Sequence, residues 1–570
     1  MPNLRRLILS SILAAGVLTV PLAPAAAQQG VAGALLAARE AGQRNDFAGA
    51  IVFLERLHAL NPQDMATLDA LVLNALSIGD RETATRHARL LSERDPANPV
   101  AALVMITAAL DAGDPETALR IAENGTALHP LIRALAQAWA HLQAGSMSDA
   151  QTAFDDVATL EGMQAFGIYC RALALAMVGD AEGALALIED PDLGVARALN
   201  RRGYMAYALL LGQVERYDDA LALIDRVFAG SGDPMLATLR EAFGRQEALP
   251  LDLIDTPAKG MAEVYSVMAS AMQSADNLNE AILYAQAAVW LNPGLTDAQL
   301  MVARILEDLG QPDAAAAAYA LIPEGDAFSM AARMGQAQVL EGRGQRQDAI
   351  AILQNLATAN PESFAAHSVL GDFLRRDNQF AAADAAYSRA LDLLSAAGRP
   401  PEWQTLFARA IARSRLNNWP AAEADFRAAL EIEPDQPQVL NYLGYSLVER
   451  GEKLEEALEM IERAVAGDPE SGYILDSLAW ALFRMGRYTE SLPHMERAVE
   501  MMPTDAILND HLGDVYYAVG RFREARFQWR RALSFAPAED LDEDRIRRKL
   551  EIGLEAVRAE DGEPPLHADR

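Results

Sequence analysis

Apolar residues recur along most of this chain at spacings of three and four, in stretches separated by short polar turns. Leu440, Leu443 and Leu447 illustrate the spacing, which places apolar side chains on one face of a helix. Glycines such as Gly486 and Gly520 mark the turns that follow such stretches. The pattern predicts an all-α chain of short helices joined by tight turns.

The helical pattern repeats at a fixed period, most clearly in the segments Gly472–Asp505 and Ala506–Glu539, which are 34 residues long each. Aligned on each other, they place Leu478 on Leu512, Ala479 on Gly513, Leu482 on Tyr516, Ser491 on Ala525, Met495 on Trp529, Ala498 on Ala532 and Pro503 on Pro537. A period of this length with small residues at fixed offsets is typical of a stacked array of helix pairs. Such arrays bind partners more often than they catalyse reactions.

Less regular copies of the same unit extend toward the N-terminus. They are expected to begin near Pro437, Trp403, Phe364, Met330, Thr296 and Ala262, and then near Arg201, Ala165, Leu131, Pro99, Met65 and Val31. A small residue near the start of each second helix lets two helices approach closely, and a proline ends many units. The sequence predicts an α-solenoid of about fourteen helix-turn-helix units, counted from these repeats.

This unit resembles the tetratricopeptide repeat, a helix-turn-helix motif of 34 residues, and the resemblance is strongest from Phe364 to Glu539. Several first helices depart from the family by carrying alanine where it has a small glycine, for example at Ala138 and Ala410. The resemblance implies a right-handed α-solenoid whose first helices line a concave groove for extended peptides or helices. It implies neither a cofactor nor a catalytic centre.

The N-terminus carries a different pattern. Arg5 and Arg6 precede an apolar run from Leu7 to Val20, and Ala25–Ala27 supplies small residues for cleavage. We predict a secretory signal peptide over residues 1–27, cut after Ala27, and therefore a periplasmic protein without a stable transmembrane segment. An uncleaved anchor is the alternative. No cysteine lies near the cut, so we expect no lipid attachment there.

The remainder is expected to form five parts. They are an N-terminal array of degenerate repeats (28–234), an irregular connection or degenerate repeat (235–261), a C-terminal array (262–539), a capping helix (540–560) and a disordered tail (561–570). The proline-containing stretch within 235–261 interrupts the regular spacing of small residues, so both interpretations of this segment stay open.

Charge and motifs narrow the function classes. The chain has 49 Lys and Arg against 80 Asp and Glu, for a net charge of -31, which disfavours nucleic acid as a partner. Cys170 is the only cysteine and lies in an apolar stretch, so we expect a buried thiol without a disulfide. No phosphate-binding loop, paired-histidine zinc motif or nucleophile elbow occurs. We expect no enzyme, no metal and no cofactor.

The candidate partner-binding residues lie on the face of three first helices opposite the apolar stripe used for stacking. Aromatic side chains provide contact area there, and polar groups can bind peptide backbone. The alternative for Trp480 and Phe483 is packing between repeats. The candidates are Gln438, Asn441, Tyr445, Val448, Tyr473, Asp476, Trp480, Phe483, Ile507, Asp510, Asp514 and Tyr517.

These features predict a periplasmic scaffold that binds protein or peptide partners along its groove. The C-terminal part also resembles tetratricopeptide proteins of the Gram-negative envelope, which implies an adaptor for a C-terminal processing protease or a cell-wall hydrolase. The alternatives are a structural component of a secretion or polysaccharide-export assembly and, less favoured, an enzyme whose site forms between distant turns.

Overall fold

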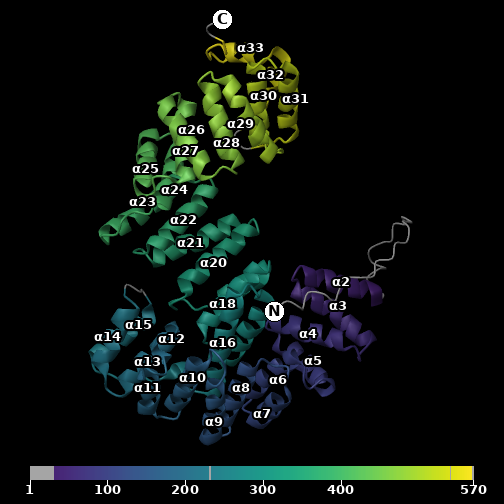
Figure 1. The fold of residues 1–570 in the computed structure, drawn as a ribbon, viewed down its shortest axis with the longest axis vertical. Coiled ribbons are helices and arrows are strands. Elements are labelled where there is room, and N and C mark those ends of the chain that lie inside the picture. The colour runs from purple at the N-terminus through teal and green to yellow at the C-terminus, as the bar shows by residue number, and fades with distance from the viewer. Residues whose placement is uncertain (1–30, 230–232, 539–540, 568–570) are drawn as a thin grey trace. The chain divides into compact units, whose positions relative to one another are not determined.

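The structure, a computed structural model, describes residues 31–229, 233–538 and 541–567, and these contain helices and turns but no β-strand (Figure 1). The chain divides into two compact units, residues 1–349 and 350–570. The predicted signal peptide, residues 1–27, lies outside the described residues.

The helices of the first unit come in chain order. They are α2 (Val31–Gln43), α3 (Phe47–Leu60), α4 (Met65–Ser77), α5 (Arg81–Arg94), α6 (Pro99–Asp111), α7 (Pro115–Asn124), α8 (Pro130–Gln143), α9 (Met147–Ala158), α10 (Gln164–Met177), α11 (Ala181–Glu189), α12 (Val195–Ala198), α13 (Arg201–Gln213), α14 (Tyr217–Val227), α15 (Pro234–Gly244), the 3-10 helix η1 (Asp252–Ile254), α16 (Pro257–Ser274), α17 (Leu278–Leu291), α18 (Thr296–Asp308), α19 (Pro312–Ala320) and α20 (Ser329–Gly342).

The boundary between the units falls within α21 (Arg346–Ala359). The second unit continues with α22 (Phe364–Arg376), α23 (Phe380–Ala396), α24 (Trp403–Arg415), α25 (Trp419–Ile432), α26 (Pro437–Arg450), α27 (Leu454–Gly467), α28 (Gly472–Arg484), α29 (Tyr488–Met501), α30 (Ala506–Ala518), α31 (Phe522–Ser534), α32 (Glu543–Ile552) and α33 (Leu554–Glu560).

The predicted α-solenoid is confirmed, because the described helices include fourteen helix-turn-helix pairs from α2–α3 to α30–α31, interrupted only by α12 and by α15 with η1. Each first helix begins within a few residues of the start expected from the repeats. The turn inside most pairs contains one residue with positive φ, which is a glycine in many pairs (Gly79, Gly486) and an asparagine in others (Asn378, Asn417). These are the two residue types that adopt that conformation at least cost.

The small residue of the first helix matters most where a large ring faces it. A Cβ added at Gly513 would lie 2.4 Å from the indole of Trp529, and one at Gly371 would lie 2.6 Å from the ring of Tyr387. Both rings are fully buried. The glycine therefore makes room for an aromatic side chain sixteen residues later in the same pair.

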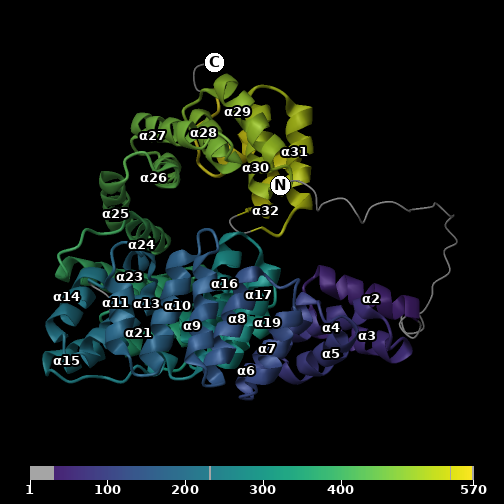
Figure 2. The same cartoon turned by 60° about the horizontal axis from the view of Figure 1, so that its bottom comes forward.

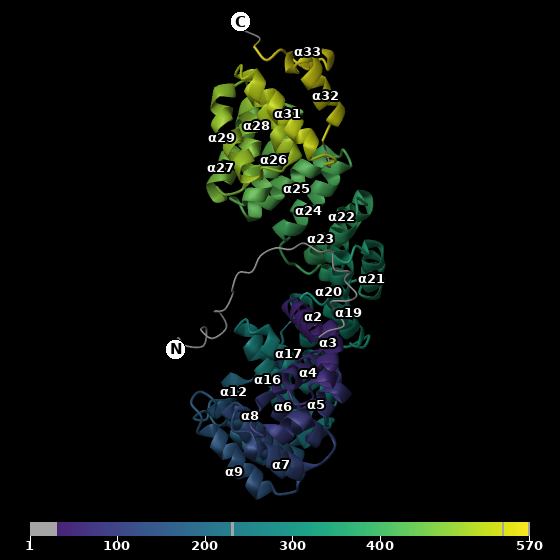
Figure 3. The same ribbon diagram turned by 90° about the vertical axis from the view of Figure 1, so that its right-hand side faces the viewer.

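In the first unit the chain folds back on its own N-terminal array. Helices α16 and α17 pack against α4, α6 and α8, and they lie beside them in both Figure 2 and Figure 3. The α16 backbone at Gly260 rests on the fully buried ring of Trp139, and the Trp290 indole donates to Asp111 at 3.0 Å. The N-terminal array and the start of the next array therefore share one core.

The interrupted interval 235–261 combines both interpretations that the sequence left open. Helix α15 takes the place of a first helix, and its Phe243 packs on Gly212 of α13. No second helix follows, and the chain runs through η1 to the start of α16. The segment is half a repeat followed by an irregular connection.

The C-terminal end differs from the prediction in two respects. The expected single capping helix is divided into α32 and α33 at Gly553, whose φ is 87°. The expected disordered tail is ordered as far as His567, because Leu566 is buried in the core of the second unit. Residues 568–570 lie outside the described residues.

Candidate functional site

The twelve candidate residues lie on α26, α28 and α30, three first helices that stack in succession. Gln438 and Tyr473 are exposed. Half-buried are Asn441, Tyr445, Ile507, Asp510 and Tyr517, and buried are Val448, Asp476, Trp480, Phe483 and Asp514. The expectation of a free face is therefore wrong for the last five, because other parts of the second unit cover them. Their part in binding a partner stays a prediction.

The buried candidates on α28 form a ladder of rings. Trp480 stacks on Phe483 with ring centroids 4.8 Å apart and on His511 at 4.0 Å. Phe483 contacts the ring of Tyr488 at 5.2 Å. The Trp480 indole donates to Glu449 of α26 at 2.5 Å, so the ladder ties three repeats together. This is the packing role that the sequence left open for Trp480 and Phe483.

One end of the ladder is charged. Nδ1 of His511 lies 2.9 Å from the Asp476 carboxylate, and the ring is buried. Burial acts to lower the pKa of His511, but the charge of Asp476, supported by Asp510 and Asp514, outweighs it. The pKa of His511 is therefore raised above 6.5.

The candidate carboxylates on α30 are occupied by the cap. The ammonium of Lys549, a fully buried side chain of α32, donates to Asp510 at 2.9 Å and to Asp514 at 2.8 Å. Burial acts to lower the pKa of Lys549, and the two carboxylates more than offset it, so the amine stays charged. Asp514 also accepts from the Trp529 indole at 2.9 Å. These aspartates hold α32 in place.

The two exposed candidates lie on α26 and at the start of α28. Tyr473 is 57% exposed and Gln438 is exposed. Between them in the repeat order, Oδ1 of Asn441 is buried and has no hydrogen-bond partner among the described residues. An unpaired buried acceptor is costly, so an N–H from a ligand would relieve that cost, although the oxygen itself is covered by the protein in this structure.

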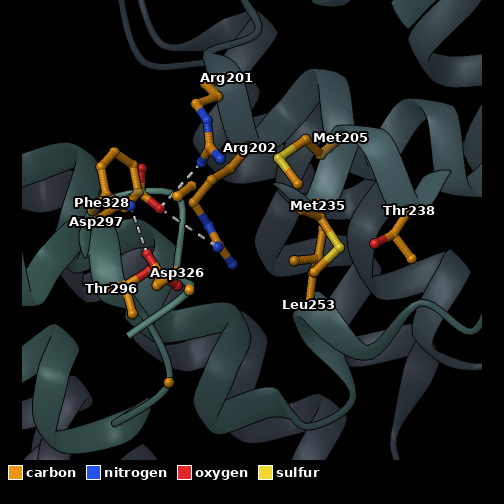
Figure 4. A pocket seen from close by; sticks show the side chains of 13 residues that line it. Arg201, Arg202, Met205, Met235, Thr238, Leu253, Thr296, Asp297, Asp326 and Phe328 are labelled. Atoms are coloured by element: carbon orange, nitrogen blue, oxygen red, sulfur yellow. Dashed lines mark hydrogen bonds and ion pairs between the residues drawn. The ribbon is translucent and has the colours of Figure 1, made fainter. Parts of the chain in front are cut away.

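Sequence reasoning missed a cleft in the first unit, with a volume of about 380 Å³ (Figure 4). One wall carries Arg201, Arg202 and Asp297, and the other carries the apolar side chains of Met205, Met235 and Leu253. Its signal in the sequence was the interrupted repeat rhythm, because α15 and η1 supply Met235 and Leu253 and no second helix fills the space.

The charges of this cleft are matched. The guanidinium of Arg202 donates to Glu263 at 2.5 Å and lies 3.8 Å from Asp297, and Arg201 pairs with Asp233. Burial raises the pKa of Asp297, while Arg202 and Arg201 oppose the shift. The cleft thus offers no unpaired arginine to an anion, and its opposite wall favours an apolar group.

Residues 31–229, 233–538 and 541–567 contain no group of three His, Cys, Asp or Glu side chains placed to hold a metal ion. Cys170 is buried, as predicted, and burial raises the pKa of its thiol, which makes it a poor nucleophile. None of the helices described is both long and apolar enough to cross a bilayer.

The stacked helix pairs define the class of protein, an α-solenoid. Within it, residues 334–398, 407–472, 450–506 and 477–539 match the family model of the tetratricopeptide repeat. The second unit and the end of the first are therefore similar to tetratricopeptide repeats, in the region where the sequence pattern most resembles that family.

Two curated relatives share part of the chain. A TPR repeat-containing protein of Pseudomonas aeruginosa is 26% identical over 194 residues, which is 34% of this chain and 32% of the relative. Bacteriophage adsorption protein A of Escherichia coli K12 is 34% identical over 94 residues, 16% of this chain and 9% of the relative. The chain thus matches a third or less of the length of either relative.

Solved structures with similar helices include yeast Tom70 and the complex of Cut9 with Hcn1. The Tom70 match covers 94% of this chain and 97% of that one, at 13% identity and a TM-score of 0.34. The Cut9–Hcn1 match covers 88% and 99%, at 13% identity and a TM-score of 0.38.

Proposed function

We propose that the protein is a non-catalytic interaction scaffold of the periplasm, which binds a protein or peptide partner on the inner face of α26, α28 and α30. The observation that carries the proposal is the unpaired Oδ1 of Asn441, a half-buried residue of α26 that follows the exposed Gln438 by three positions, with the exposed Tyr473 at the start of the next first helix. A partner's backbone N–H would satisfy this acceptor, and the aromatic side chains would bury its apolar groups.

The location and the class of partner are further parts of the same proposal. The predicted signal peptide supports export, and the chain's net charge of -31 supports a protein partner over nucleic acid. Among protein partners we favour a C-terminal processing protease or a cell-wall hydrolase, for which the chain would serve as an adaptor.

The experiment is site-specific photo-crosslinking in the native envelope. A crosslinking residue at Tyr473 should capture a partner protein, and Asn441→Ala should reduce the yield several-fold. The matched control is Phe527 on α31, which is 62% exposed but lies on a second helix of the same unit. A protease or hydrolase captured from Tyr473 alone supports the adaptor. A barrel or a polysaccharide synthase supports the alternative of an export assembly.

Two outcomes would contradict the binding face itself. One is capture of the same proteins from Tyr473 and Phe527. The other is an Asn441→Ala variant with unchanged yield. Export is checked separately, by fractionation and by the mass of the mature chain, which should lack residues 1–27. Retention of the protein in the cytoplasm would contradict the proposed location.

A further inference from the structure

We propose that the second unit contains a receptor site for a short acidic segment with two prolines followed by leucine and histidine, and that the chain's own residues 563–567 occupy it. This inference rests on the proposed function, since it names the chemistry of one partner segment and how the chain regulates access to it. We call residues 563–567, Glu-Pro-Pro-Leu-His, the C-terminal segment.

The C-terminal segment is bound through its leucine and histidine. Leu566 is only 6% exposed, and it belongs to the core of the second unit. The hydroxyl of Tyr488 donates to the Leu566 carbonyl at 2.7 Å. The ring of His567 packs edge-on against Tyr488 at 5.5 Å, and its Nε2 lies 3.2 Å from the Ala518 carbonyl.

The acidic and proline part is held by two arginines of the cap. Arg558 donates to the Pro564 carbonyl at 2.7 Å and pairs with Glu563 at 3.0 Å. Arg545 pairs with Glu563 at 2.5 Å. Side chains thus bind the carbonyls of Pro564 and Leu566 together with the carboxylate of Glu563. Recognition of backbone and charge in this way can transfer to any segment of the same sequence.

The prolines reduce the conformational entropy that such a ligand loses on binding. A Pro-Pro step has little conformational freedom to lose, and it has no N–H groups that need partners in the bound state. Side-chain specificity then falls on one apolar residue, Leu566, and on one carboxylate, Glu563. The receptor therefore fits an acidic, proline-containing peptide better than a helix or a basic segment.

The receptor is continuous with the predicted groove. Tyr488, which receives both Leu566 and His567, contacts Phe483, and Phe483 stacks on Trp480. The buried candidate residues on α28 thus support the ring that binds the segment. A partner segment that displaces residues 563–567 would meet the same ring, and the chain's own segment competes with it at high effective concentration.

The experiment uses the full-length chain and a labelled peptide, Asp-Gly-Glu-Pro-Pro-Leu-His, corresponding to residues 561–567. Leu566→Asp should release the intramolecular segment, so the peptide should bind this variant at least tenfold more tightly than it binds the wild type, as measured by fluorescence anisotropy. Tyr488→Phe on the Leu566→Asp background should weaken binding about fivefold, because one hydrogen bond to the leucine carbonyl is lost. A scrambled peptide is the control.

The inference is overturned if the peptide fails to bind Leu566→Asp while that variant keeps the helical content and melting temperature of the wild type. It is also overturned if the peptide binds wild type and variant equally. Should Leu566→Asp unfold the cap, Leu566→Ala replaces it, with the same expected order of affinities. Crosslinking from Tyr473 is independent of this peptide, so its success alongside failed peptide binding would reject the receptor and leave the scaffold in place.

Discussion

The inner faces of the two units are both covered by the chain itself, but by elements of different kinds. In the first unit Thr107 and Trp139, each eight residues after its repeat start, are buried beneath α16, an eighteen-residue helix with its own core. In the second unit Trp480 and Asp514 have the same offset. Asp514 is paired with Lys549 of α32, and Trp480 stacks on Phe483, which contacts Tyr488, the ring that binds the C-terminal segment. A partner can displace a short segment more easily than a packed helix, so the second unit is the better place to seek competition.

Substitution of Lys549, which pairs with Asp510 and Asp514, tests whether the packing of α32 on the second unit depends on a single charge. Lys549→Met leaves the buried Asp514 and the half-buried Asp510 without their cation, which should cost about 3–5 kcal/mol of unfolding free energy. We expect this loss in the second unit alone, measured by urea unfolding together with hydrogen exchange of α30 and α32.

The matched control for Lys549→Met is the triple variant Lys549→Met, Asp510→Asn, Asp514→Asn. It removes all three charges and should recover most of the stability, because no carboxylate is then left unpaired. Wild-type stability of Lys549→Met would mean that α32 is held by its apolar contacts and that the comparison between the units is weaker than the contacts indicate.

The corresponding test of the first unit is Gly260→Ala. The new Cβ would lie 2.4 Å from the ring of Trp139, so α16 must shift away from α8, at a cost of about 1–3 kcal/mol. Hydrogen exchange should accelerate in α8 and α16 and stay unchanged in α30. Gly342→Ala is the control, since nothing lies within 4 Å of its added Cβ, and it should be neutral or slightly stabilising. Equal effects of the two substitutions would contradict the tight closure of the first unit.

A smaller effect should distinguish the C-terminal segment, which covers part of the second unit, from α16, which covers the first. Leu566→Ala removes part of one buried leucine side chain, so the local opening free energy of the C-terminal segment should fall by about 1–2 kcal/mol. The amide of Glu563, which donates to the Arg558 carbonyl, should then exchange faster, while amides of α16 keep their protection. Global unfolding should hardly change. A comparable drop in the melting temperature of the whole chain would show that the segment is part of the cooperative core.

The sequence predicted the fold well because each repeat unit is determined by residues that lie close together in the chain. Each pair needs its own turn residue, such as Gly486 or Asn378, and its own small residue, such as Gly513, so all fourteen first helices could be placed before the structure was known. The candidate site was predicted less well. Val448, Asp476, Trp480, Phe483 and Asp514 have the right offset, but what covers them lies elsewhere in the chain.

Two long-range features explain the errors. Lys549 reaches Asp510 across 39 residues, and Leu566 reaches Tyr488 across 78. Neither separation is a multiple of the repeat length, so the repeat pattern could not reveal these two contacts. The cleft beside Arg202 was missed for a related reason, since it results from a second helix that is absent after α15.

The smallest expected effect is a difference in how the stability of the two units depends on pH. One histidine in each unit should make the two slopes opposite in sign. The pKa of His511 is raised, so its contribution to the second unit is complete below about pH 6.5 and is lost as the pH rises through the folded value. Burial lowers the pKa of His58 in the first unit, so that unit should instead gain stability as the pH rises toward 6.5.

Hydrogen exchange of α3 and α30, followed between about pH 5.5 and 8 and corrected for intrinsic rates, would measure both slopes. His511→Asn should flatten the slope of α30 only, because it removes the titrating imidazole that lies beside Asp476. A wild-type slope retained in His511→Asn would assign the pH dependence to another group and remove His511 from the account of how the second unit is closed.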